Sequence, residues 1–180
     1  MKKCLFTLLS LATLTLSAQT DGRLYNISEA ISAERIKSDI KTLTEFGTRH
    51  TLSDTVSKRR GIGAARRWIK AEFEQISKDC GDCLEVFYQK NLVEKGTNER
   101  IVHDVEVVNV VAIKRGTKFP NRYILMSGDI DSRVSDPTDF TSDSPGANDN
   151  ASGMAGTIEA ARILSKYDFE QSVVFVGLSG

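Results

Sequence analysis

The sequence predicts an α/β fold, in which helices pack against a sheet of buried strands. The chain has 180 residues and 40% hydrophobic content, which suffices for one domain with its own core. Apolar residues recur at helical spacing in some segments, whereas other segments are short, continuous apolar runs rich in β-branched residues. Because the two kinds of segment alternate, we expect a sheet covered by helices on both faces.

Residues 1–18 are interpreted as a signal peptide. Lys2 and Lys3 form a positive start, residues 4–16 form an apolar run, and the small Ala18 offers a cleavage point. The apolar run is too short to span a bilayer. We therefore expect a secreted or periplasmic protein with no stable membrane anchor after cleavage.

The first helix of the domain is predicted from Ser32. Ile36, Ile40 and Leu43 follow at helical spacing, and the pattern ends near Gly47. The polar run of residues 47–60 is expected to be a solvated loop.

A second helix is predicted from Gly61 to Lys78, and a C-x-x-C pair, Cys80 and Cys83, follows it. In an exported chain this pair favours a local disulfide that closes the turn between the helix and the next strand. Free thiols, or metal or redox chemistry, are the alternatives.

Strands are predicted at residues 84–89, 104–113, 122–126 and 172–178, with a helix at residues 152–167 before the last strand. The run at 122–126, "RYILM", has the character of a short, fully buried strand. The sequence stops just past the last strand, where a sheet of this class normally continues. We therefore expect residues 19–180 to be the N-terminal part of a longer domain.

The loop at residues 127–150 is rich in aspartate, and Arg133 is its single basic residue. Ligand sites of open α/β sheets lie outside the carboxyl ends of strands, which is where this loop begins. Six carboxylates repel one another unless solvent or a cation separates them, and oxygen ligands favour calcium, magnesium or manganese. We expect amide donors at the start of the next helix to hold Asp149. The loop therefore indicates a divalent-metal site, with a plain solvated loop as the alternative. The six aspartates are Asp129, Asp131, Asp136, Asp139, Asp143 and Asp149.

At these residues the chain resembles a known family. "SGDIDS" at 127–132, followed by "SPGANDNASGMAGTIEAARIL" at 144–164, is similar to the co-catalytic dizinc aminopeptidases. That zinc metallopeptidase superfamily also contains the glutaminyl cyclases. The upstream "GTRHT", "GIGAARRWI" and "VVNVVA" look like the family as well, so the resemblance covers roughly residues 30–180. It implies a three-layer α/β/α sandwich with a mixed, mainly parallel sheet, here incomplete at the C-terminus.

The resemblance also implies a reaction: hydrolysis of N-terminal peptide bonds in peptide or protein substrates by a water that two zinc ions activate. By position, Asp149 would bridge both metals, and Asp131 would be the catalytic-site aspartate that orients the first ligand. The family's Glu-Glu pair, which supplies the general base, and its later ligands would follow residue 180. We therefore expect an active metallo-aminopeptidase as the full-length protein and no activity from these 180 residues alone.

Asp129 departs from the pattern, because the resemblance places a histidine ligand there. Asp129 could replace it as a ligand, which would allow manganese, cobalt or calcium besides zinc. The site could also have one metal, or be degenerate. Two other functions remain open: a glutaminyl-cyclase-like acyltransferase, and a non-catalytic, metal-stabilised pseudo-peptidase that binds a partner. The 24 basic and 24 acidic residues balance, which argues against binding to nucleic acid.

Overall fold

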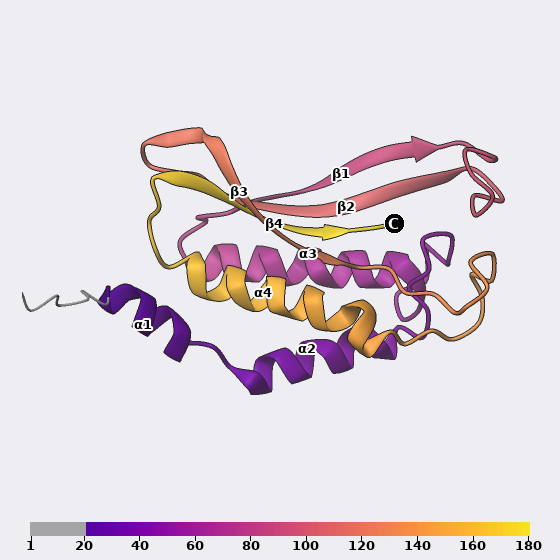
Figure 1. Ribbon diagram of the computed structural model, residues 1–180, viewed down its shortest axis with the longest axis horizontal. Helices are drawn as coiled ribbons and strands as arrows, with labels where there is room; N and C mark the ends of the chain where they lie inside the picture. Colours follow the sequence, from indigo (N-terminus) through magenta and orange to yellow (C-terminus); the bar gives the residue numbers. More distant parts are fainter. Residues whose placement is uncertain (1–20) are drawn as a thin grey trace, which may run out of the picture.

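The computed structural model describes residues 21–180, so the predicted signal peptide lies outside the described residues. Helices and strands alternate in the second half of the chain, as predicted, and a short helix that the sequence did not suggest precedes them (Figure 1). The elements in chain order are α1 (Gly22–Glu29), α2 (Ala33–Glu45), α3 (Gly61–Asp79), β1 (Glu85–Val93), β2 (Val105–Lys114), β3 (Phe119–Asp129), the π-helical turn η1 (Ala147–Ala151), α4 (Ser152–Leu164) and β4 (Gln171–Leu178).

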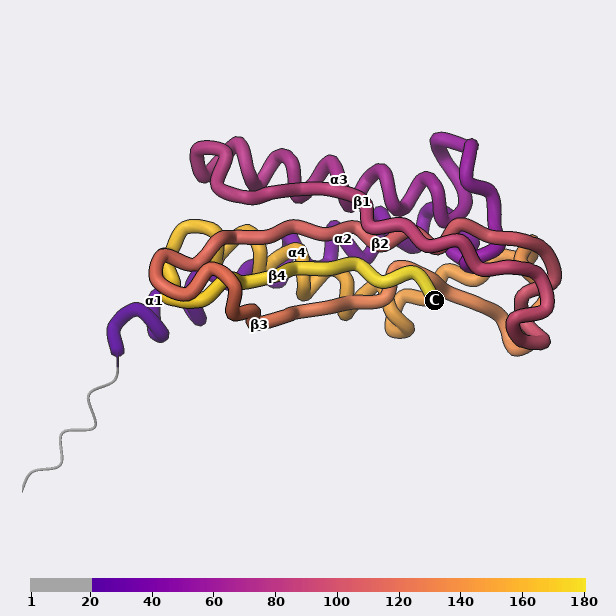
Figure 2. Tube along the Cα trace, turned by 90° about the horizontal axis from the view of Figure 1, so that it is seen from above, coloured from indigo at the N-terminus to yellow at the C-terminus, as the bar shows by residue number. Residues whose placement is uncertain are grey.

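The four strands form one mixed sheet in the order β1-β2-β4-β3, which Figure 2 shows from above. β1 and β2 form an antiparallel hairpin, β4 is antiparallel to β2, and β3 is parallel to β4. The mixed sheet is confirmed, but the expected predominance of parallel pairing is wrong for the described strands. The reason is connectivity: only β3 and β4 are joined by a crossover helix, α4, and parallel neighbours require such a connection.

Helices α3 and α4 pack on one face of the sheet, α3 against β1 and β2 and α4 against β3 and β4. Helix α2 lies on α4, farther from the sheet (Figure 1). The described residues therefore contain two of the three expected layers. Within residues 21–180, no helix combines the length and the apolar character needed to cross a membrane.

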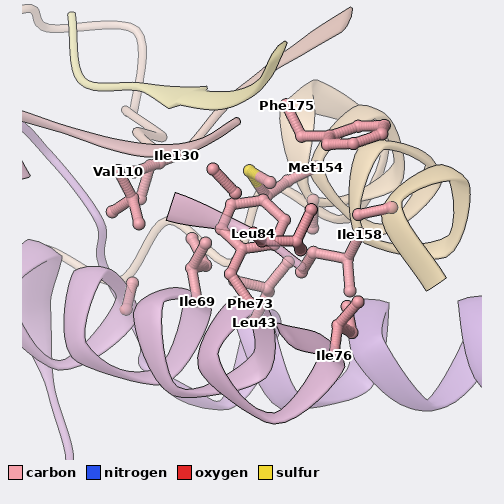
Figure 3. Packing of buried hydrophobic residues seen from close by; sticks show 14 of the residues in the cluster. Leu43, Ile69, Phe73, Ile76, Leu84, Val110, Ile130, Met154, Ile158 and Phe175 are labelled. Carbon is pink, nitrogen blue, oxygen red and sulfur yellow. The ribbon is translucent and has the colours of Figure 1, made fainter. Parts of the chain in front are cut away.

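The core lies between these helices and the sheet (Figure 3). Phe73 of α3 and Met154 and Ile158 of α4 meet Val110 of β2 and Phe175 of β4, and each of the five is fully buried. The α/β class that the sequence predicts is thus present.

The turn between α3 and β1 carries the predicted disulfide. Cys80 follows the last residue of α3 and bonds to Cys83 at an S–S distance of 2.02 Å. Neither free thiols nor a metal ligand pair describes this turn. The prediction of a local disulfide is confirmed.

Strand β3 is less buried than its sequence suggested. Tyr123, Ile124, Leu125 and Met126 are 52%, 54%, 61% and 36% exposed, so the prediction of a fully buried strand is wrong within the described structure. β3 has a single strand neighbour, β4, because it lies at an edge of the described sheet. Strand β4 lies between two strands, and its segment 172–177 is buried.

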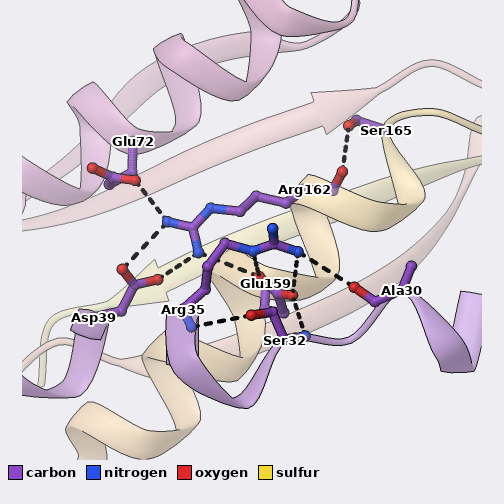
Figure 4. Close-up of polar contacts among 8 residues, drawn as sticks. All are labelled: Ala30, Ser32, Arg35, Asp39, Glu72, Glu159, Arg162 and Ser165. Atoms are coloured by element: carbon purple, nitrogen blue, oxygen red, sulfur yellow. Dashed lines mark hydrogen bonds and ion pairs between the residues drawn. The ribbon is translucent and has the colours of Figure 1, made fainter. Parts of the chain in front are cut away.

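A buried ion-pair network ties the three larger helices together (Figure 4). Arg162 of α4 contacts Asp39 of α2 at 2.7 Å, Glu72 of α3 at 2.7 Å and Glu159 of its own helix at 3.3 Å. Arg35 of α2 contacts Glu159 at 3.0 Å. Because each carboxylate has a cationic partner, the charges can be buried between the helices.

Candidate metal centre

The aspartate-rich loop leaves the sheet at the carboxyl ends of its parallel strands. Asp129, the last residue of β3, lies opposite Leu178, the last residue of β4. The next residue, Ile130, donates its amide to the Leu178 carbonyl at 2.6 Å. The loop therefore begins at the edge where open α/β sheets bind ligands, as the sequence predicted.

The start of α4 brings Asp129 and Asp149 to one region. Gly128, just before Asp129, packs so closely on α4 that an added Cβ would lie 2.5 Å from the Met154 amide nitrogen. Asp149 lies in η1, immediately before α4, with a non-helical backbone at φ −118° and ψ 97°. Both aspartates are exposed. The two predicted ligands thus flank the first turn of the same helix.

The predicted capping role of Asp149 is not seen. The N-cap of α4 is Ala151, and no side chain there accepts a hydrogen bond from the helix. The turn η1 continues directly into α4, so Ala151 already has a helical backbone and the amide of Ala151 bonds to the Gly146 carbonyl at 3.0 Å. The Asp149 carboxylate therefore stays available for other partners.

Asp131 is partly buried beside the end of the sheet, where it accepts the Gly180 amide at 3.2 Å. Burial raises the pKa of Asp131 above its usual value, and the neighbouring charge of Asp129 adds to this, although the Gly180 amide and His50 act in the opposite direction. Arg133 does not relieve the repulsion between the Asp129 and Asp131 carboxylates, since its guanidinium donates to the carbonyl of the neighbouring Val134 and has no ion pair within the described structure.

Three of the six loop aspartates have hydrogen-bond or ion-pair partners that hold the loop in place. Asp136 and Asp139 accept hydrogen bonds from nearby hydroxyl and amide groups, which hold the pKa of each carboxyl below its usual value. Asp143 pairs with Arg60. These three carboxylates are thus engaged within the described structure, and the remaining three are the predicted site residues.

The described residues offer part of a metal site and do not complete one. In residues 21–180, no three His, Cys, Asp or Glu side chains gather closely enough to hold an ion. Carboxylate oxygens of Asp129 and Asp149 have suitable donor chemistry for zinc or a harder divalent cation. The Asn150 side-chain oxygen, next to Asp149, is buried without a hydrogen-bond partner. Any bound metal would need further ligands.

Histidine does not fill this gap among the described residues. His50 is buried and engaged on both sides: Nδ1 accepts the Leu52 amide at 3.1 Å, which leaves Nε2 to donate to the Pro137 carbonyl at 3.0 Å. His103 is exposed and lies against the ring of Phe140. His50 is thus a buried histidine of the loop before α3, and both of its ring nitrogens are engaged within the loop regions.

Arg49 is the site residue that sequence reasoning missed. It lies in the run of residues 47–60 that was expected to be solvated, yet Arg49 is fully buried and bonds to both ends of the acidic loop. A single arginine in a polar stretch has no periodic pattern that distinguishes it from a surface charge. The only hint was that "GTRHT" looks like the dizinc aminopeptidases.

Comparison with known proteins identifies a family that this chain resembles. Residues 109–180 match the model of peptidase family M28. A probable zinc metalloprotease of Pyrenophora tritici-repentis is 40% identical over 160 residues, 89% of this chain and 37% of the relative. A second, from Leptosphaeria maculans, is 44% identical over 152 residues, 84% of this chain and 35% of the relative. The chain spans about a third of the length of these curated relatives.

Solved structures share the fold. A glutaminyl cyclase of Fimbriiglobus ruber superposes with a TM-score of 0.59 at 19% identity, over 83% of this chain and 45% of that one. A leucine aminopeptidase precursor of Bacteroides thetaiotaomicron gives a TM-score of 0.61 at 18% identity, over 82% and 47%. At these identities the likeness concerns the fold alone.

Proposed function

The chain belongs to the zinc metallopeptidase superfamily that includes peptidase family M28, and from this membership we propose that it is the N-terminal part of a secreted, metal-dependent aminopeptidase. The proposal covers the removal of N-terminal residues from peptides, the use of two metal ions, and export. The length of the relatives, of which this chain spans about a third, supports a role as part of a larger protein.

One observation carries the proposal. Asp129 and Asp149, twenty residues apart in the sequence, flank the first turn of α4 at the carboxyl edge of the sheet. In the proposed enzyme both hold metal through carboxylate oxygens, together with ligands from outside the described residues. Zinc in such a place supplies Lewis-acid chemistry for a peptide carbonyl and lowers the pKa of a water molecule. Asp131 lies partly buried behind this edge and orients a neighbouring ligand.

Export is supported by the signal-peptide pattern of residues 1–18 and by the Cys80–Cys83 disulfide, which fits an oxidising compartment. N-terminal sequencing of the protein recovered outside the cytoplasm tests this part. A mature chain that begins at Gln19 is expected. Retention of residues 1–18 in an exported protein would contradict it.

Activity is tested with peptides that have free or acetylated N-termini, using the 180-residue chain and a protein of the relatives' length. We expect the longer protein to hydrolyse only the free peptides, to lose activity with a chelator and to recover it with zinc. Cyclisation of N-terminal glutamine in place of hydrolysis would favour the glutaminyl-cyclase alternative. Absence of turnover in a zinc-loaded longer protein would favour the non-catalytic binding domain.

A further inference from the structure

Arg49 lies between α2 and α3, and its side chain is fully buried although it ends in a charge. It has no carboxylate partner among its hydrogen bonds. Nε donates to the carbonyl of Ile130 at 2.8 Å, and Nη1 donates to the carbonyls of Leu43 at 2.9 Å and Pro145 at 2.6 Å. Nη2 donates to the carbonyl of Gly146 at 3.1 Å. The guanidinium is therefore satisfied by four main-chain carbonyls from three segments.

Two of these segments belong to the acidic loop of residues 127–150, and we call them its two limbs. The first limb is the start of the loop, around Ile130, and the second is its end, around Pro145 and Gly146. Ile130 lies between Asp129 and Asp131, and Gly146 is three residues before Asp149. The guanidinium of Arg49 thus binds main chain on both sides, next to the residues predicted to hold or orient metal.

The contact with Gly146 reaches the turn that contains the second aspartate. The Gly146 carbonyl accepts from Arg49 and also from the amide of Ala151, so one oxygen joins the guanidinium to η1. Gly146 has a φ of +50°, and an added Cβ would lie 3.1 Å from Arg49 Nη2. Glycine therefore permits both the left-handed backbone and the close approach.

The main chain around Arg49 strengthens the same link. The Arg49 amide donates to Ser132 Oγ at 3.0 Å, and that hydroxyl donates to the Ser144 carbonyl at 2.6 Å. The Ser144 amide in turn donates to the Gly47 carbonyl at 2.9 Å. Residues 47–49 are thus hydrogen-bonded to both limbs, so the limbs cannot separate without breaking these hydrogen bonds.

Burial lowers the pKa of Arg49 to about 10, although the charge of Asp131 acts in the opposite direction. The guanidinium still carries its charge near neutral pH. The planar, forked guanidinium can reach carbonyls in several directions, whereas the ammonium of lysine donates from one point. Lysine at this position would keep the positive charge but could not reach all four carbonyls that the guanidinium binds.

We propose that Arg49 is a positioning residue that fixes the separation of Asp129 and Asp149, and thereby sets the metal affinity of the site. The inference rests on the proposed function, because it assigns to these two aspartates a common metal. Arg49 does not touch the metal in this account. It acts through the main chain of the two limbs.

The test compares the wild type with Arg49→Lys, Arg49→Met and the control Arg162→Met. Arg162 is also a largely buried, hydrogen-bonded arginine, but its contacts join α2, α3 and α4 and do not include the acidic loop. Zinc affinity is measured in the protein of the relatives' length, which supplies the further ligands, by competition with a chromophoric chelator under conditions where circular dichroism shows each variant to be folded. Both Arg49 variants are expected to bind zinc roughly 10- to 100-fold more weakly. Arg162→Met is expected to match the wild type, although it is less stable.

A second readout does not depend on metal. Spin labels are attached at Ser127→Cys and Asn148→Cys, two exposed positions near the two aspartates, in a chain of residues 19–180, whose only other cysteines, Cys80 and Cys83, are joined in the disulfide. The label-to-label distance distribution is expected to be narrow in the wild type and in Arg162→Met, and broadened in both Arg49 variants. An unchanged distribution in Arg49→Met would overturn the inference, as would zinc affinity equal to that of the wild type.

The two readouts separate the inference from the proposed function. If no variant, including the wild type, binds zinc while the labels broaden only in the Arg49 variants, the metal proposal fails and the role of Arg49 in spacing the limbs stands. If Asp149→Ala abolishes zinc binding while both Arg49 variants retain it, the metal proposal stands and the positioning role is wrong.

Discussion

Replacing Arg162 by methionine removes the cation shared by three carboxylates and tests how the helical layer is held together. Asp39 and Glu159 are 6% and 2% exposed. Without Arg162, the one cation that still pairs with either carboxylate in the described structure is Arg35, which bonds to Glu159. Asp39 is then left buried without a cationic partner. Removing one partner of a buried ion pair costs about 3–5 kcal/mol. Since the side chain of Arg162 is 18% exposed, water offsets part of this cost and we expect the lower end, about 3 kcal/mol.

In a chain of this length, a loss of about 3 kcal/mol lowers Tm by roughly 6–12 °C. Urea unfolding, followed by circular dichroism near neutral pH, measures the free energy directly. The matched control is Lys41→Met, because Lys41 pairs with Glu45 at 3.8 Å on the same layer but the two side chains are 77% and 64% exposed. The control is expected to lose no more than about 0.5 kcal/mol.

Although burial acts in the opposite direction, hydrogen bonds from Arg35, the Ser32 amide and Arg162 hold the pKa of Glu159 below its usual value. The part of this stabilisation that Arg162 supplies is lost as Glu159 is protonated, so acid should narrow the difference in unfolding free energy between Arg162→Met and the wild type. A loss in Arg162→Met no larger than that of Lys41→Met would show that the network does not stabilise the fold. A loss that is equally large in acid would show that packing of the arginine stem, and not its charge, is responsible.

Three further predictions concern the sheet edge and the disulfide. Gly128→Ala is expected to cost about 1–3 kcal/mol in urea unfolding, because its Cβ would meet the main chain of α4, whereas Gly156→Ala, where nothing lies within 4 Å, should gain up to about 1 kcal/mol. Replacing Cys80 and Cys83 by serine should lower the free energy of unfolding by about 2 kcal/mol, because the disulfide closes a short loop and so restricts the unfolded chain. An unchanged free energy of unfolding would contradict this account. Burial raises the pKa of Asp131 above 3.8, so ionisation of this carboxyl lowers the free energy of unfolding as pH rises. Asp131→Asn should therefore be more stable than the wild type near neutral pH, and the difference in stability should close in acid. A difference that widens in acid would contradict the raised pKa.

Local sequence patterns predicted most of the elements. Ser32 begins α2 as its N-cap, with Oγ accepting the Arg35 amide at 3.3 Å, and the helical face with Leu43 is buried where the spacing placed it. The disulfide was also predictable, because its two cysteines are three residues apart and close a turn. In each case the residues that decide the structure are neighbours in the chain.

Properties that depend on distant partners could not be predicted. "RYILM" and "SVVFVGL" were both predicted as strands, and their different burial follows strand order, which places β4 inside and β3 at an edge of the described sheet. Arg49 is similar in this respect. Its burial depends on carbonyls 81 and 96 residues away in the sequence, at Ile130 and Pro145.

The positions of the candidate site residues were predicted in outline, and their roles stay predictions. Asp129, Asp131 and Asp149 do lie along one edge of the sheet, because the strand end and the helix start that carry them were both recognised. The roles of Asp136 and Asp139 were not foreseen, since a turn aspartate that binds its own loop has the same sequence signature as a free ligand.

The central claim is that the acidic loop holds a catalytic metal through Asp149. The most direct test is the zinc content of a purified, dialysed protein of the relatives' length, measured by mass spectrometry for the wild type, Asp149→Ala and Asp143→Ala. Asp143 is the matched control, because it belongs to the same loop but pairs with Arg60. We predict that the wild type and Asp143→Ala retain zinc and that Asp149→Ala loses it. Equal zinc in all three proteins would contradict the account.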